Sequence, residues 1–383
     1  MSIGAGRLRR ALDHQYAAAV TVGVGALVAL VWSAAGPRSY RVIVTHEWFT
    51  RHPINLHLVA FNGAMTLFFA AVGLELSREL RANVRHHLRA SLSPLLGAVG
   101  GMMGTALLSV GVGILVDSPA LRRGWGVPMA TDIAFTLGVL ALAGDKVPSH
   151  LRLFLLTLAI ADDVLSVVVL SATGVSRVRG AGFLAVFVVV LVGLWLARHA
   201  SPALTWGIIV VPMWLAFAWA GIEPALSGVV TGLLTPVHSP RARRLEASVS
   251  RWSVALALPL FALVACGVTW SSLDLSGNTT KVIGGTMFVR LVGKMLGIGA
   301  GVALAHRFGA RRHTSLTTSI LIGATLLCAI GFTVPLLFAG ALYPLSSATY
   351  GAFTLGLLGA SVLGGVLGVS ILRRATHASA PSP

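Results

Sequence analysis

Charged residues are scarce in this chain of 383 residues. Asp, Glu, Lys and Arg together make up 11% of it, against roughly 25% in a typical soluble domain. Acidic residues are the rarer kind, with 12 against 29 basic ones, and no long polar linker or low-complexity tract interrupts the apolar sequence. These absences exclude a soluble multidomain protein and predict one integral membrane domain over residues 1–383.

Cysteines and catalytic motifs are equally sparse. The chain holds two cysteines, Cys266 and Cys328, and each lies in apolar sequence, so we interpret both as small core residues. None of the 12 histidines has a metal-ligand spacing such as HExxH, and the sequence contains no nucleophile–base set or cofactor motif. We therefore expect no enzyme activity and no cofactor.

The chain is rich in apolar stretches of spanning length. Hydrophobic residues make up 56% of it, and the mean hydropathy is +0.85. We predict an all-α polytopic membrane protein with about twelve transmembrane helices, each of which needs roughly 17–25 apolar residues. The expected spans are 16–35, 54–74, 92–116, 125–144, 151–175, 180–197, 203–220, 222–236, 252–272, 283–305, 316–341 and 349–372.

The basic residues alternate between loops and do not gather on one face. Most of the 29 fall on one side of the predicted spans, the side that also holds both ends of the chain. The positive-inside rule places that side in the cytoplasm, with short tails at residues 1–15 and 373–383. The basic residues behind the net charge of +17 therefore anchor the protein in the membrane, and their placement excludes a nucleic-acid partner.

Glycine, proline and polar residues interrupt one predicted span near its middle. In GVPMATDIAFTLGVLALAG, Gly126 and Pro128 weaken the helical hydrogen bonds. Thr131 and Asp132 can satisfy the backbone groups that are released. One interpretation is a proline kink in which Asp132 caps the following half-helix. The other is an unwound segment at membrane depth that lines a binding site.

A second predicted span is interrupted in the same way. LLCAIGFTVPLLFAGALY carries Gly331, Thr333 and Pro335 in mid-span. The chain then contains two comparable three-span units, at about 92–175 and 283–372, each with its interrupted span in the middle. Paired interruptions of this kind are typical of the binding site of a transporter built from repeats.

Two adjacent aspartates, Asp162 and Asp163, lie within the apolar run LAIADDVLSVVVL. An ionised carboxylate at the centre of a membrane helix costs at least about 2.5–3.5 kcal/mol. Neighbouring residues on a helix point about 100° apart, so one can face an aqueous cavity while the other faces a neighbouring helix. Adjacent carboxylates resist simultaneous ionisation, so the pair can hold protons or a hard cation. The alternative is two aspartates buried for structure.

A cationic partner for this pair is available in FVRLVGKMLGIG, where Arg290 and Lys294 lie four residues apart. Arg290 is near the predicted entrance of its span and is expected to snorkel to the membrane surface. Lys294 lies deeper, so we expect it to pair with Asp162 or Asp163. At about 4 Å and an effective dielectric constant near 20, such a pair gains roughly 4 kcal/mol. A structural salt bridge and a switchable ion pair both remain open.

Glu75, in FFAAVGLELSREL, lies at the predicted cytoplasmic end of the second span. Because Arg78 and Glu79 are beside it, a solvated cluster at the membrane surface is one interpretation. The other is an acidic lip of a cytoplasmic funnel that gathers cations.

Together these motifs resemble a known family. ATDIAFTLGVLALAG, LAIADD, VGLELSREL, LVGKMLGI, GIEPALSGVVTGLLTP and GFTV resemble the NhaA-type sodium/proton antiporters of bacteria, from about residue 10 to 374. The resemblance implies an inverted-repeat fold in the bacterial inner membrane, with discontinuous helices at spans four and eleven. It also implies exchange of cytoplasmic Na⁺ or Li⁺ for external H⁺, electrogenic and activated at alkaline pH. Antiporters of this family are among the examples behind the rule on paired interruptions, so the two arguments are not independent.

The resemblance also implies a role for each candidate residue. Asp163 is the central carboxylate that binds the cation and the proton, and Asp162 pairs with Lys294. Thr131 joins the two aspartates as a Na⁺ ligand. Asp132 compensates the positive ends of the discontinuous helices, and Lys294 the negative ends. Glu75 belongs to a cytoplasmic funnel that responds to pH.

Six positions depart from the family pattern and bear on packing around the site and on pH regulation. They are Asn62, Leu165, Glu223, Ala265, Met295 and Pro335. A leak channel for protons or cations would need the same ligands as an antiporter, so it remains an alternative, as does a transport-inactive membrane sensor. The expected partners are Na⁺, Li⁺, H⁺ and membrane lipid, and both a monomer and a homodimer are open.

Overall fold

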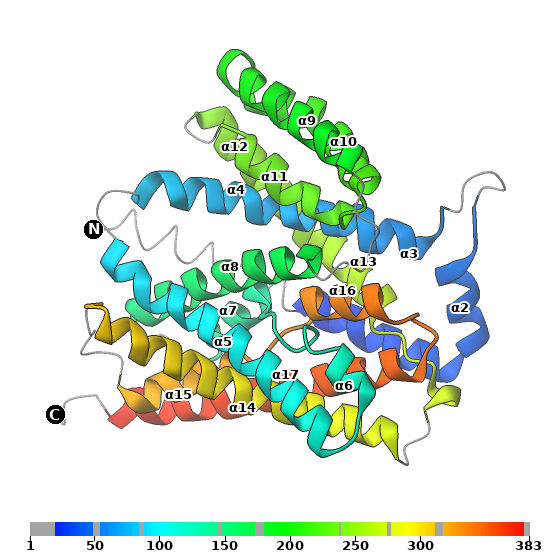
Figure 1. Cartoon of the computed structure of the whole chain (residues 1–383), viewed down its shortest axis with the longest axis vertical. Helices are drawn as coiled ribbons and strands as arrows, with labels where there is room; N and C mark the ends of the chain where they lie inside the picture. Colours follow the sequence, from blue (N-terminus) through cyan, green and yellow to red (C-terminus); the bar gives the residue numbers. More distant parts are fainter. Residues whose placement is uncertain are drawn as a thin grey trace. The chain divides into compact units, whose positions relative to one another are not determined.

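The computed structural model describes residues 20–48, 54–83, 88–143, 147–172, 180–236, 239–273, 277–310 and 317–378. Within these ranges every regular element is a helix (Figure 1). The predicted tail 1–15 lies outside the described residues, as does the part of the tail 373–383 beyond residue 378.

Eight of the described helices are long and apolar enough to cross a membrane. They are Leu56–Glu75, Leu92–Leu115, His150–Leu170, Gly180–His199, Pro202–Ala220, Pro240–Ala265, Asn278–Arg307 and Ala348–Thr376. Four apolar helices are shorter, namely Val20–Ala35, Pro224–Leu234, Thr318–Leu327 and Thr333–Leu342. The all-α polytopic class is therefore confirmed for the described residues, while the count of twelve spans stays a prediction.

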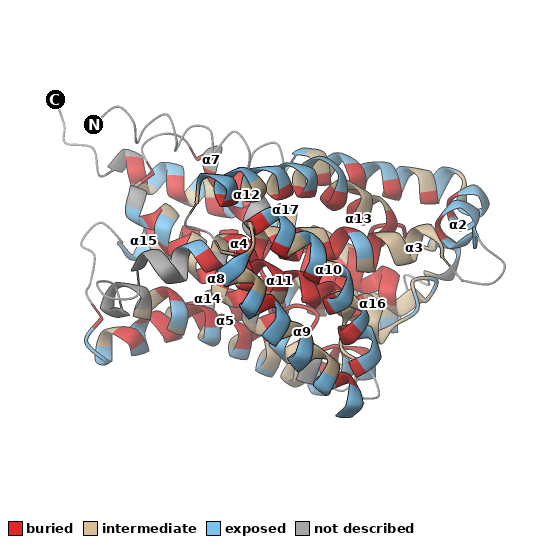
Figure 2. Cartoon of the chain, turned by 90° about the horizontal axis from the view of Figure 1, so that it is seen from above, coloured by how far each residue is buried: buried red, intermediate tan, exposed pale blue. Residues whose placement is uncertain are grey.

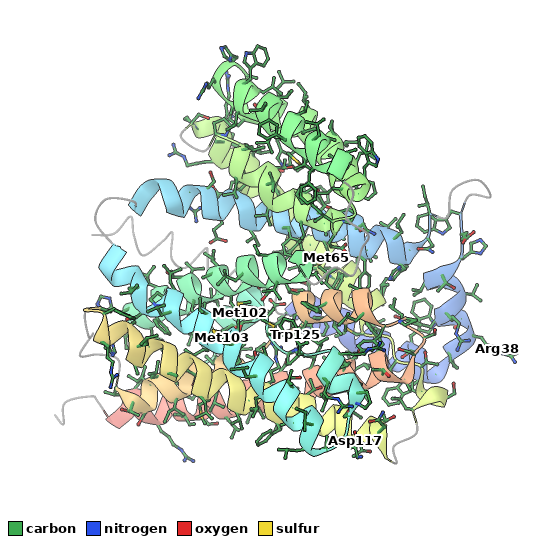
Figure 3. The ribbon with its side chains drawn as sticks, viewed as in Figure 1. Arg38, Met65, Met102, Met103, Asp117 and Trp125 are labelled. Atoms are coloured by element: carbon green, nitrogen blue, oxygen red, sulfur yellow. The ribbon has the colours of Figure 1, made fainter. Side chains whose placement is uncertain are left out.

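Exposed positions follow one side of many helices, where the ribbon is pale blue (Figure 2). Many of these exposed residues are large and apolar. In α9 (Gly180–His199) only 17% of the most apolar stretch is buried. On α5 (Leu88–Leu115), Met102 is buried while the adjacent Met103 is 57% exposed (Figure 3). A helix that is apolar on its exposed side as well as its packed side is typical of contact with lipid.

The chain divides into two compact units, each described here by itself. Unit 1 comprises residues 87–169 and 265–383 together with the first twenty residues. Its further helices are α6 (Pro119–Arg123), α7 (Ile133–Ala141), most of α8 (Ser149–Ala172), η4 (Trp270–Ser272), α14 (Asn278–Arg307), α15 (Thr318–Leu327), α16 (Thr333–Leu342) and α17 (Ala348–Ala378). The two segments predicted as repeats, 92–175 and 283–372, fall almost entirely within unit 1.

Glycines bring α5 and α14 into backbone contact in unit 1. A Cβ atom on Gly100 would overlap the carbonyl oxygen of Gly297, and one on Gly297 would overlap that of Gly100. One turn further, a Cβ on Gly104 would lie 2.8 Å from the Gly293 carbonyl oxygen. Small residues at such crossings let membrane helices approach closely. The contact fixes the rotation of α14, which carries Arg290 and Lys294.

Unit 2 comprises residues 21–86 and 170–264. Besides α9 it contains α2 (Pro37–Thr45), α3 (Leu56–Leu58), η1 (Val59–Ala64), α4 (Met65–Asn83), α10 (Pro202–Ala220), η2 (Pro224–Leu226), α11 (Ser227–Leu234), α12 (Pro240–Trp252), η3 (Ser253–Ala257) and α13 (Leu258–Ala265, whose last residue belongs to unit 1). Here α4 and α11 pack through Gly73, Gly228 and Gly232, and a Cβ atom on any of the three would meet the backbone of the other helix.

Candidate functional site

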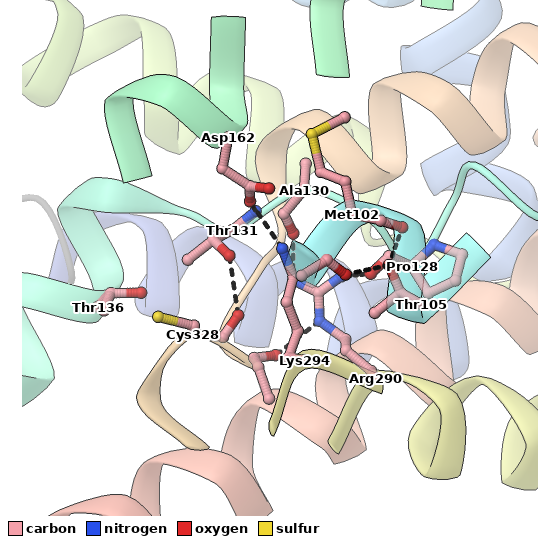
Figure 4. Close-up of polar contacts among 12 residues, drawn as sticks. Met102, Thr105, Pro128, Ala130, Thr131, Thr136, Asp162, Arg290, Lys294 and Cys328 are labelled. Atoms are coloured by element: carbon pink, nitrogen blue, oxygen red, sulfur yellow. Dashed lines mark hydrogen bonds and ion pairs between the residues drawn. The ribbon is translucent and has the colours of Figure 1, made fainter. Parts of the chain in front are cut away.

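Two non-helical segments of unit 1 lie side by side: residues 124–132 between α6 and α7, and residues 328–332 between α15 and α16. We refer to these two segments together as the crossing. The Asp132 N–H donates to the Ile330 carbonyl at 3.0 Å. The Thr131 hydroxyl donates to the Cys328 carbonyl at 2.9 Å (Figure 4). The first segment contains the predicted Gly126, Pro128 and Thr131, and the second contains Gly331, whereas Thr333 and Pro335 lie in the first turn of α16.

The Asp132 carboxylate caps two helices at the crossing. Its Oδ1 accepts from the Phe135 N–H at 3.2 Å, which is the N-cap bond of α7. Its Oδ2 accepts from the Thr333 hydroxyl at 3.0 Å and from the Thr333 N–H at 3.4 Å, at the start of α16. Helix N-termini favour negative charge, so one buried carboxylate serves the N-termini of both half-helices.

Arg290 supplies the opposite charge to the same crossing. Its Nε donates to the Ala329 carbonyl at 2.6 Å, its Nη1 to the Pro128 carbonyl at 3.1 Å, and its Nη2 to the Ala130 carbonyl (Figure 4). The side chain is fully buried, so the prediction that Arg290 snorkels to the membrane surface is wrong. The physical reason is that the crossing exposes carbonyl oxygens within reach of a guanidinium, which a single helix considered alone does not reveal.

Asp162 and Lys294 form a fully buried ion pair, in which Lys294 Nζ lies 2.8 Å from Asp162 Oδ2. The same oxygen accepts from the Thr131 backbone N–H at 2.6 Å. Of the two partners that the sequence left open for Lys294, the structure selects Asp162. The other oxygen of this carboxylate, Oδ1, has no hydrogen-bond partner within the described part of the chain.

Asp163 is buried next to this pair, and both of its carboxylate oxygens lack a hydrogen-bond partner among the described residues. The buried Ser166 hydroxyl, on the same helix, is also unpartnered there. Ser166 lies one turn beyond the aspartates and, at about 100° per residue, between them around the helix. Buried polar oxygens normally have a hydrogen-bond partner. These four oxygens, one of Asp162, two of Asp163 and one of Ser166, can therefore accept a proton, a cation or water.

Comparison with known proteins identifies the chain's relatives. The family model described as Na⁺/H⁺ antiporter 1 matches residues 9–372. The chain belongs to that family. The Na⁺/H⁺ antiporter NhaA of Bifidobacterium adolescentis is 36% identical over 333 residues, covering 80% of this chain and 73% of that one. The NhaA 2 antiporter of Novosphingobium aromaticivorans is 36% identical over 328 residues (83% and 82%), and the NhaA of Salmonella arizonae 34% over 337 residues (85% of each).

Membership of the Na⁺/H⁺ antiporter 1 family, together with the eight membrane-capable helices, makes the chain an integral membrane protein. Within unit 1 the structure brings together five of the six residues singled out in the sequence: Thr131, Asp132, Asp162, Asp163 and Lys294. The sixth, Glu75, is on α4 of unit 2. It is partly buried and lies 3.7 Å from Arg78, which also pairs with Glu246.

Two polar residues of this candidate site could not be assigned to it from the sequence. Arg290 is predicted at the membrane surface, although it lies only one helical turn from Lys294. Ser166 carries little signal by itself, because a serine in a membrane helix usually bonds to the carbonyl four residues earlier. Its position in the turn after two aspartates was the available signal.

Proposed function

We propose that the protein exchanges Na⁺ for H⁺ across the membrane through the aspartate pair of α8. The observation that carries the proposal is a set of three buried carboxylate oxygens that have no hydrogen-bond partner among the described residues, Oδ1 of Asp162 and both oxygens of Asp163. The names of the relatives, which are Na⁺/H⁺ antiporters, support the same activity.

In this proposal Na⁺ binds to oxygen ligands that protons also occupy. Asp163 supplies two oxygens and Asp162 one, which suits a hard cation. The Thr131 hydroxyl, which donates to Cys328, retains lone pairs for the ion, and the Ser166 hydroxyl is free to turn toward it. Since a proton and Na⁺ cannot hold the same oxygens together, binding of one releases the other.

Lys294 gives the exchange a second charge to move. With its ammonium on Asp162 Oδ2, the ion pair is neutral, and in the site without Na⁺ Asp163 holds a proton that Na⁺ binding displaces. If Na⁺ binding draws Asp162 away from Lys294, the lysine can release a proton as well. Two protons then leave for each Na⁺, and the cycle carries one positive charge inward.

The rest of the architecture follows the family in this proposal. The eight long helices, the helices Val20–Ala35 and Pro224–Leu234, and the interrupted pairs α6–α7 and α15–α16 make twelve spans, of which the pairs are the discontinuous spans four and eleven. The segments 92–175 and 283–372 are inverted repeats within one membrane domain. Both termini lie on the cytoplasmic side of a bacterial inner membrane, and lipid surrounds the exposed apolar faces. A homodimer and a monomer both stay open. Li⁺ is a second cargo, no cofactor takes part, and the protein is not an enzyme.

Counterflow in proteoliposomes tests this function against a leak channel. Vesicles loaded with unlabelled Na⁺ and diluted into tracer Na⁺ should accumulate the tracer transiently above equilibrium, because an exchanger couples entry to exit. The matched control is Asp163→Asn protein at the same density. With the membrane potential held at zero by equal potassium on both sides and valinomycin, a channel would let the tracer equilibrate without overshoot. A sensor would give the same trace as empty vesicles. Either result would refute antiport.

A further inference from the structure

We propose that Arg290 is the positioning residue of the crossing. Its guanidinium holds the peptide group between Ala130 and Thr131 so that the N–H of this peptide points at Asp162. Because Arg290 binds the carbonyls of the crossing, Lys294 is available for the ion pair with Asp162. The role of Arg290 in transport rests on the proposed antiport, whereas its role in holding the crossing is independent of that function. Transport assays measure the first role and hydrogen–deuterium exchange measures the second.

One peptide group connects Arg290 to the aspartate pair. The carbonyl of Ala130 accepts from Arg290 Nη2, and the N–H of Thr131, which belongs to the same planar peptide, donates to Asp162 Oδ2 at 2.6 Å. A cation at the oxygen end and a carboxylate at the hydrogen end both strengthen the polarisation of this amide. Because the peptide is planar, fixing its oxygen also fixes the direction in which its N–H points.

The guanidinium also connects the two segments of the crossing. It donates to Pro128 and Ala130 in the first segment and to Ala329 in the second. Three nitrogens in a rigid plane serve three carbonyls, an arrangement that a lysine ammonium at the end of a flexible stem cannot match. Gly331 leaves the space for this plane, since a Cβ atom there would overlap Arg290 Nη2.

The resemblance implies that Lys294 compensates the negative ends of the discontinuous helices, but its hydrogen bond in the described structure goes to Asp162. Arg290, one turn earlier on α14, donates to carbonyls in the two non-helical segments that follow α6 and α15. With Asp132 at the N-termini of α7 and α16, the crossing has one buried charge of each sign, and Lys294 is additional to both.

The experiment compares Arg290→Met, Arg290→Lys and Lys294→Met with Arg307→Met, an exposed arginine on the same helix, as the control. In vesicles, we expect Arg290→Met to raise the Na⁺ concentration for half-maximal exchange about tenfold, the effect of one misplaced charged hydrogen bond. Arg290→Lys should recover part of this, and Arg307→Met should behave as the wild type. A merely structural role would lower the amount of folded protein and the maximal rate but leave the half-maximal concentration unchanged.

Hydrogen–deuterium exchange measures the crossing without transport. The Asp132 amide donates across the crossing to Ile330, and the Thr131 amide donates to Asp162. Peptides covering 126–132 and 328–333 should therefore exchange about tenfold faster in Arg290→Lys than in the wild type. Lys294→Met should leave peptide 328–333 at its wild-type rate. Wild-type exchange of both peptides in Arg290→Lys would overturn the proposal even if Arg290→Met does not fold, and so would faster exchange of 328–333 in Lys294→Met. Wild-type vesicles without Na⁺ exchange would refute the antiport function alone.

Discussion

At the scale of single residues, the sequence predicted which charges are buried better than it predicted what they contact. The cost of a carboxylate in a membrane identified Asp162 and Asp163, and the depth of Lys294 predicted an ion pair, which lies on Asp162. Arg290 was misplaced because its acceptors come from the backbone of two other segments. Main-chain acceptors leave no mark in the sequence except the glycine and proline that free them.

The Asp163→Asn substitution should abolish exchange without preventing insertion. Asparagine keeps the volume of the side chain but can neither release a proton nor give the cation a full negative charge. The measurement is Na⁺-dependent dequenching of a pH dye in vesicles, with Asp117→Asn as the control. Asp117 is exposed and has a positive φ of 47°, which asparagine also tolerates. Clear dequenching by the Asp163→Asn protein would remove Asp163 from the proposed site.

The Ser166→Ala substitution should weaken Na⁺ binding without changing the proton sites. Loss of one neutral oxygen ligand is worth on the order of 1 kcal/mol, so the half-maximal Na⁺ concentration should rise about three- to tenfold. Ser118→Ala is the matched control, because Ser118 is also buried and its hydroxyl is also unpartnered within the described chain. Equal half-maximal concentrations in the two variants would show that Ser166 is not a ligand.

At the scale of helices, glycine and proline predicted the non-helical segments 124–132 and 328–332. Close packing accounts for other glycines, whose role the sequence does not reveal. Gly297 faces α5, whereas a Cβ on Gly299, two residues later, meets nothing within 4 Å. Both glycines look alike in the sequence, because the difference lies in which face of α14 meets a partner. The bonds between the two segments of the crossing could not be predicted for the same reason.

This difference gives a matched pair of substitutions. Gly297→Ala should destabilise the protein by about 1–3 kcal/mol, because the new methyl group meets the backbone of Gly100 and forces α5 and α14 apart. Gly299→Ala should be neutral or slightly stabilising, since alanine favours the helix. Thermal unfolding in detergent, followed by the loss of monodisperse protein, compares the two. Equal midpoints would mean that the helices are not in contact at Gly297.

At the scale of the whole molecule, composition predicted a polytopic membrane protein, and the motifs predicted its family. The division into two compact units was not predicted. Apolar sequence is alike in both units, so it carries no record of which helices pack together. The two predicted repeat segments lie in the same unit, and their inverted relation stays a prediction.

Competition between protons and Na⁺ should govern the pH response of the whole transporter. If both occupy the aspartate pair, the half-maximal Na⁺ concentration should rise as the pH falls, approaching about tenfold per pH unit for each proton displaced. Initial rates of dequenching between pH 6.5 and 8.5 over a range of Na⁺ concentrations measure this. A half-maximal concentration that does not change with pH would mean that the two ions use separate sites.

The net charge moved per cycle can be measured in the same vesicles. Two protons for one Na⁺ would make uptake sensitive to voltage, since each charge moved through 100 mV is worth about 2.3 kcal/mol. Na⁺ uptake at zero pH gradient should therefore differ between potassium/valinomycin clamps of opposite sign. Equal rates under the two clamps would mean neutral exchange, with Lys294 keeping its proton throughout.

The bonds at the crossing have a mechanical consequence. Thr131 and Cys328 are 197 residues apart, yet their hydrogen bond is one of several that fasten one interrupted segment to the other. Sliding one segment past the other would break these bonds and separate buried charges from their partners, at a cost of several kcal/mol. We therefore expect the two segments to move together. If the aspartate pair binds the ion as proposed, the hinge that opens the site has to lie away from the crossing.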